Sequence, residues 1–241
     1  MNRAKGQLPK FDGLIFDMGD VLYDATVWRR WLIQLLHRMG LHTRYRGFFK
    51  LWEQEYLDDV HRGRREYGEA FQAFLLAAGL SRGHIDEVVA ASHARKRQIE
   101  AGTRALPGVR QTIARLSRQG VVLAVLSDSE STSELLHARL VQLGLGGRFT
   151  AVVSSFDLER TKPDPACYQA ALTAIGMPAE QVAFVGHDAE ELAGAKAVGL
   201  RTLAFNFEPG AKADRYLTRF EELLDYTGRR AARDAEYMEA A

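Results

Sequence analysis

The sequence is poor in cysteine and proline, contains no long apolar run, and carries charges that nearly cancel. One cysteine cannot form an internal disulfide, which favours a reducing compartment, and Cys167 is predicted to be a buried small side chain rather than a nucleophile. No run of about 18 apolar residues occurs, so no membrane-spanning helix is expected. The first ten residues lack the apolar core of a signal peptide. We therefore expect a cytoplasmic protein with no membrane partner.

The near balance of 32 basic and 31 acidic residues also limits the class of partner. A net charge of +1 gives no electrostatic reason to expect nucleic acid, whereas a local pocket could still bind a small anion. The 241 residues can bury a core without disulfides, as one large domain or as a domain with a smaller companion. A monomer and a homodimer are both compatible with this composition.

Short apolar runs alternate with helical patterns over most of the chain. The runs typical of buried strands are 13–16, 121–126, 151–153, 182–185 and 201–205. The amphipathic segments between them are 109–118, 134–143, 165–175 and 190–198. Strands that alternate with helices favour parallel pairing, so the sequence predicts an α/β fold with a doubly wound parallel sheet.

The stretch 26–103 differs because it shows no strand pattern. Successive amphipathic helices are predicted over 28–39, 46–60, 67–78 and 85–99, with glycines between them. We call this stretch the helical insert and expect it to form a separate domain. The α/β body is then expected to comprise residues 1–25 and 104–241. The weakly apolar tail after Tyr226 is predicted to be a frayed helix.

Polar residues follow the predicted strands at their carboxyl ends, where ligands bind in such sheets. Asp17 follows the first strand, and Ser127 and Asp188 follow two others. A strand-end aspartate beside backbone NH groups is suited to be a carboxylate nucleophile, although aspartate also commonly begins a turn. Ser127 could instead cap the following helix.

Taken together, four motifs in the same order resemble those of the haloacid dehalogenase-like superfamily. They are Asp17 with Val21 and Leu22, then Ser127, then Lys162 within Thr161–Pro165, and finally Phe184–Asp188 with Glu191, Gly194 and Ala195. Each motif is weak alone, but their combination over about residues 11–206 is specific. The resemblance implies a three-layer α/β body in which the helical insert is the family's helical cap.

The resemblance also implies a hydrolase that acts on a small phosphorylated metabolite through an aspartyl-phosphate intermediate. Asp17 would be the nucleophile, and Ser127 and Lys162 would stabilise the transferring group. Asp128 is expected to contact the substrate. Arg29, soon after the first motif, could clamp an anion with two hydrogen bonds, or could simply lie on a solvated helix face.

Two positions depart from the family pattern. Where the family's phosphatases carry a second aspartate that protonates the leaving group, this chain has Gly19, and Asp20 is the candidate substitute. Where the family places a magnesium-binding aspartate directly after glycine, this chain has His187. The expected metal ligands are therefore Asp17, the Gly19 carbonyl and Asp188, with His187 as a ligand or as a neighbouring hydrogen-bonding residue. Mg²⁺ is the expected ion, and Mn²⁺ becomes plausible if imidazole is a ligand.

These departures leave two other hypotheses open. In a 2-haloacid dehalogenase, Asp17 would attack carbon and no metal would be needed. A non-catalytic binding or regulatory protein could also retain the scaffold, although the retention of Asp17, Ser127 and Lys162 together argues for an enzyme.

Overall fold

The computed structural model describes residues 10–228, so most of the tail predicted as a frayed helix lies outside the described residues. The body contains one six-stranded sheet in the order β3-β2-β1-β4-β5-β6, and every neighbouring pair is parallel. The strands are β1 (Gly13–Phe16), β2 (Val122–Ser127), β3 (Ala151–Ser154), β4 (Val182–Gly186), β5 (Arg201–Phe205) and β6 (Arg215–Leu217). The predicted parallel α/β sheet is confirmed, and β6 is an additional edge strand that we did not predict.

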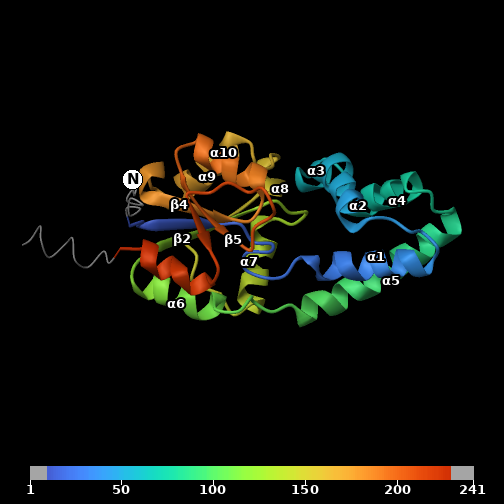
Figure 1. Ribbon diagram of the computed structural model, residues 1–241, viewed down its shortest axis with the longest axis horizontal. Helices are drawn as coiled ribbons and strands as arrows, with labels where there is room; N and C mark the ends of the chain where they lie inside the picture. The colour runs from blue at the N-terminus through green and yellow to red at the C-terminus, as the bar shows by residue number, and fades with distance from the viewer. Residues whose placement is uncertain (1–9, 229–241) are drawn as a thin grey trace, which may run out of the picture.

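Helices cover both faces of the sheet and produce three layers (Figure 1). The body helices are α6 (Val109–Arg118), α7 (Ser133–Gln142), α8 (Ser155–Leu158), α9 (Pro165–Ile175) and α10 (Ala189–Ala197), with 3₁₀ turns η2 (Ala179–Gln181) and η3 (Phe220–Tyr226). Successive β1 side chains point to opposite faces. Leu14 and Phe16 pack in the core that includes α6, α7 and η3, whereas Ile15 packs with α9 and α10. Because both faces are covered, the central strands β1 and β4 are apolar throughout.

The helical insert lies beside this body and has a core of its own (Figure 1). It contains α1 (Thr26–Arg38), α2 (Tyr45–Trp52), a π-helical turn η1 (Glu53–Leu57), α3 (Asp58–His61), α4 (Tyr67–Ala77) and α5 (Arg82–Gly102). The core is rich in aromatic rings, with Trp52 packed against both Phe71 and Phe74. None of the helices within residues 10–228 is long and apolar enough to cross a bilayer.

The predicted single helix over 46–60 is interrupted in the structure. The η1 turn separates α2 from α3, and a π turn shifts the positions of all later side chains around the helix axis. Trp52, Leu57 and Val60 are all buried in the insert core across this interruption. Apolar spacing alone did not reveal the extra residue in the turn, because the buried positions still recur at near-helical intervals.

Candidate active site

The parallel register brings the predicted motifs together at one edge of the sheet. Strand β1 lies between β2 and β4, and Phe16 is in register with both Val125 and Val185. The residues that follow these three strands therefore emerge side by side, as expected for the carboxyl edge of a parallel sheet. Asp17 occupies the centre, directly after β1.

Asp17 forms a buried charge cluster with Lys162 and Glu191. The Lys162 Nζ atom lies 2.7 Å from Asp17 Oδ1 and 2.9 Å from Glu191 Oε2. Lys162 and Asp17 are only 6% and 5% exposed. Burial opposes the charge of Lys162, but Asp17, Glu191 and Asp128 outweigh it, so the pKa of the ammonium group is raised well above its usual range. The cluster thus holds a permanent cation against the carboxylate of Asp17.

Glu191 is the member of this cluster whose role we did not predict. It lies in the first turn of α10, and burial together with the negative charge of Asp17 raises its pKa well above the usual range, against the lowering effect of Lys162. The raised pKa favours the protonated form of Glu191 even though the Lys162 ammonium group lies 2.9 Å away. A sequence signal existed, since Glu191 aligns with a later acid of the fourth motif, but it did not identify Lys162 as the partner.

His187 is placed against the other oxygen of Asp17. It follows β4 directly, and its Nε2 atom lies 3.4 Å from Asp17 Oδ2. Asp188, which we expected to bind metal, caps α10. Its Oδ1 atom accepts hydrogen bonds from the backbone NH groups of Glu190 (2.8 Å) and Glu191 (2.9 Å).

The donor set therefore does not fit a magnesium site. Within residues 10–228, no three or more His, Cys, Asp and Glu side chains are arranged to hold a metal ion. Mg²⁺ prefers six oxygen ligands in near-octahedral geometry, whereas an imidazole occupies one side of Asp17 and an ammonium group the other. The expected set of Asp17, Gly19, Asp188 and His187 remains a prediction that this geometry does not favour.

The loop after β1 holds Asp20 in a structural role. Asp20 has a positive φ of 55°, and its Oδ1 atom accepts a hydrogen bond from the NH of Ala25 at 2.9 Å. Its backbone carbonyl accepts a hydrogen bond from the Asn206 amide at 2.9 Å. Asp20 is therefore engaged in closing the loop, and this geometry does not favour it as a substitute for the acid missing at Gly19.

Ser127 and Asp128 lie at the end of β2, next to Asp17. Ser127 is 5% exposed, and it does not cap α7, because Thr132 does so through its side chain. Asp128 Oδ1 accepts a hydrogen bond from the backbone NH of Lys162 at 3.2 Å, which ties the second and third motifs together. Burial raises the pKa of Asp128 to about 6, against the lowering effect of Lys162.

Arg29 lies in α1 and is paired with Glu53 from η1. The Arg29 Nη1 atom is 2.5 Å from Glu53 Oε1, and the pair is partly exposed. Burial raises the pKa of Glu53, Arg29 lowers it, and the negative charges of Glu208 and Asp188 in the body raise it further. Arg29 is thus paired rather than freely solvated, and its role as an anion clamp stays a prediction.

Comparisons with known proteins agree with this architecture. The sequence model of haloacid dehalogenase-like hydrolases matches residues 11–199. The chain is 30% identical over 138 residues to a phosphoglycolate phosphatase from Pseudomonas fluorescens, covering 55% of this chain and 50% of that protein. It is 33% identical over 102 residues to (S)-2-haloacid dehalogenase 4A from Burkholderia cepacia, covering 42% of this chain and 43% of that protein.

A solved structure extends the likeness to nearly the whole fold. The structure of a predicted phosphoglycolate phosphatase from Haemophilus somnus superposes with a TM-score of 0.67 at 18% identity, over 91% of this chain and 99% of that one. The chain spans about half the length of the curated relatives it matches. Because the family match covers most of the sequence, this chain belongs to the haloacid dehalogenase-like hydrolases.

Proposed function

We propose that this protein hydrolyses a small phosphomonoester through a covalent intermediate on Asp17, with the helical insert as the cap over the site. The observation that carries the proposal is the buried Asp17 carboxylate at the carboxyl end of β1, with Lys162 Nζ at 2.7 Å. Curated relatives named as phosphoglycolate phosphatases support a phosphorylated substrate. A cytoplasmic location and a monomeric or homodimeric state remain predictions.

The chemistry has two displacements at phosphorus. An Asp17 oxygen forms a bond to phosphorus while the bond to the leaving alkoxide breaks, and the alkoxide takes up a proton from solvent water. Water then attacks the aspartyl phosphate, releasing phosphate and restoring the carboxylate. Lys162 and Ser127 stabilise the negative charge on the transferring group. Because Asp20 is engaged in its loop, we assign it no proton transfer.

No step is assigned to a metal ion. His187 and Lys162 flank the two oxygens of Asp17, and Asp188 caps α10, so the residues gathered here do not form an oxygen-rich magnesium site. Phosphatases of this family are expected to use Mg²⁺, and the assay therefore has to include Mg²⁺, Mn²⁺ and a chelator as separate conditions.

A second candidate is a 2-haloacid dehalogenase, in which Asp17 attacks carbon and displaces halide. His187 Nε2 lies 3.4 Å from Asp17 Oδ2, and Gly19 stands where the family's phosphatases carry a second aspartate. These two residues favour a reaction that needs neither a metal ion nor that aspartate. Water then hydrolyses the resulting ester to give the hydroxy acid. The haloacid dehalogenase among the relatives supports testing it.

The test is turnover of 4-nitrophenyl phosphate and of 2-chloropropionate by the full chain, each with Mg²⁺, Mn²⁺ or chelator. We expect phosphate release that Asp17→Asn lowers at least about 10³-fold, as for removal of a covalent nucleophile. A phosphoryl group on the peptide containing Asp17, found by mass spectrometry after rapid quenching, would identify the intermediate. Halide release with no phosphate release would instead establish the second candidate.

His187 provides a matched pair of variants for the metal question. His187→Asp restores an oxygen ligand beside Asp17, whereas His187→Asn removes the imidazole without adding a carboxylate. If the geometry is correct, only His187→Asp should gain binding of Mg²⁺ or Mn²⁺ by calorimetry. Tight Mg²⁺ binding by the unaltered protein, abolished by Asp188→Asn, would contradict our interpretation of the donor set.

A further inference from the structure

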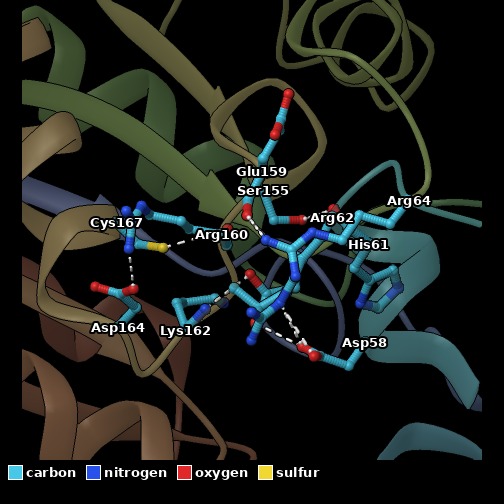
Figure 2. Close-up of polar contacts among 12 residues, drawn as sticks. Asp58, His61, Arg62, Arg64, Ser155, Glu159, Arg160, Lys162, Asp164 and Cys167 are labelled. Atoms are coloured by element: carbon cyan, nitrogen blue, oxygen red, sulfur yellow. Dashed lines mark hydrogen bonds and ion pairs between the residues drawn. The ribbon is translucent and has the colours of Figure 1, made fainter.

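A single turn of the helical insert, α3 with the following Arg62, forms polar contacts with the body beside the active site. Figure 1 places α3 at the end of the insert nearest α8, and these two elements are in contact. Thr161 Oγ1 donates a hydrogen bond to Asp58 Oδ1 at 2.7 Å. Arg62 Nη2 donates to Thr161 Oγ1 at 3.0 Å, and Arg62 Nε lies 3.0 Å from Asp58 Oδ2. Figure 2 shows Asp58 and Arg62 joined in this way. We call this closed triangle of Asp58, Arg62 and Thr161 the α3 latch.

Ser155 provides a second tie between α3 and the body. It is fully buried as the first residue of α8, directly after β3, and its Oγ atom donates a hydrogen bond to the His61 carbonyl at 2.8 Å. The same Oγ accepts a hydrogen bond from the backbone NH of Ser129 at 3.0 Å. Ser129 lies two residues after Ser127, so this tie leads directly to the second motif.

Both ties end on backbone that carries reacting groups. Thr161 is 6% exposed and is covalently adjacent to Lys162, whose NH is bound to Asp128. A shift of Thr161 therefore moves the Lys162 backbone, because the peptide bond holds consecutive Cα atoms about 3.8 Å apart. The latch is polar and partly exposed on the insert side, which suits a contact that can form and break. The Thr161 hydroxyl is the group through which the latch reaches the third motif.

We propose that Asp58 and Thr161 are positioning residues, through which contact of the insert with the body sets Lys162 against Asp17. The inference rests on the proposed roles of Asp17 and Lys162 in hydrolysis. Its consequence is that the site is completed when α3 is seated, so turnover is coupled to the placement of the insert. A displacement of about 1 Å in a positioned group can lower a rate by about 10²-fold, so a small movement of Lys162 is enough to matter.

The test uses Thr161→Val in the full chain, because valine keeps the buried volume and removes only the hydroxyl. We expect kcat for the substrate that the enzyme turns over to fall about 10- to 100-fold, with a smaller change in KM. Thr161→Ser should restore most of the rate because it restores the donor. Arg160→Ala is the matched control, since the exposed Arg160 side chain pairs with Asp164 on the same loop at 2.9 Å and is not part of the α3 latch. A wild-type kcat for Thr161→Val would overturn the proposal.

Hydrogen exchange separates failure of this inference from failure of the proposed function, because it needs no substrate. In Thr161→Val, amides of both 58–64 and 158–163 should exchange faster, and Asp58→Ala should reproduce the change in both segments. The Arg160→Ala control should leave 58–64 unchanged. If only the segment carrying the substitution responds, α3 and the Lys162 loop are not coupled and the inference is wrong.

Discussion

The α/β body and the helical insert differ in how they use polar residues. In the body, Asp17 after β1, Lys162 in the loop before α9 and Glu191 in α10 are buried together at the carboxyl edge of the sheet. In the insert, the core is aromatic and apolar, and the charged residues Asp58 and Lys96 make their contacts across the boundary with the body. The body therefore holds the chemistry in fixed geometry, and the insert is attached by interactions that cost less to break.

The same substitution at two lysines gives the largest contrast between the regions. Lys162→Met leaves Asp17 and Glu191 buried without their cation, which we expect to lower the free energy of unfolding by about 3–5 kcal/mol and turnover by about 10³-fold. Lys96 pairs with Glu130 at 2.7 Å, but the pair is about one third exposed, so Lys96→Met should cost about 1 kcal/mol or less. Urea unfolding and kcat measure both effects. Equal losses would remove the distinction between the two regions.

Core truncations test whether the regions unfold separately. All three tryptophans lie in the insert, at positions 28, 31 and 52, so tryptophan fluorescence reports on the insert while far-UV circular dichroism reports on both regions. Phe71→Ala in the insert core should cost about 3–5 kcal/mol and move the fluorescence midpoint ahead of the dichroism midpoint. Phe220→Ala in the body is the matched control, and it should not advance the fluorescence midpoint ahead of the dichroism midpoint. Coincident transitions in Phe71→Ala would show one cooperative unit instead.

Lowering the pH is expected to have the smallest effect, and it acts on His61, which lies where the insert contacts the body. Burial lowers the pKa of His61 to about 4, with Lys162 and Arg29 lowering it further and Glu130 and Asp58 opposing them. The folded state thus binds this proton more weakly than the unfolded chain does at about 6.5. Its stabilising contribution is complete above pH 6.5 and is lost as the pH falls from 6.5 to about 4. We expect a loss of about 1 kcal/mol, because His61 is partly exposed.

The pH profile is measured by urea midpoints from tryptophan fluorescence, with His61→Gln as the comparison. The substitution should flatten the profile between pH 6.5 and 4 and leave a separate loss at lower pH. That second loss comes from Glu130, whose pKa is lowered to about 2 because Lys96 outweighs burial, so its contribution disappears as the pH falls below about 4.5. An unchanged slope above pH 4.5 in His61→Gln would argue against a role for His61.

The sequence by itself determined the parallel α/β body, the helical insert and the strand-end positions of Asp17 and Ser127. These follow from local patterns, since apolar runs, helical periodicity and glycine stops are all short-range signals. The departures at Gly19 and His187 were also visible, because they lie inside recognisable motifs. What His187 faces was not visible.

Only the tertiary structure decided which side chains meet. Lys162 and Asp17 are 145 residues apart in the chain, and Thr161 and Asp58 are 103 apart. No local pattern encodes such pairs, because their distance depends on sheet register and on how the insert seats against the body. The interruption of the 46–60 helix also depends on packing in the insert core, whereas the Asp188 cap of α10 is a local contact with the NH groups two and three residues further on. The physical reason is that the partners of these side chains come from segments far away in the sequence, and only the folded chain brings them within contact distance.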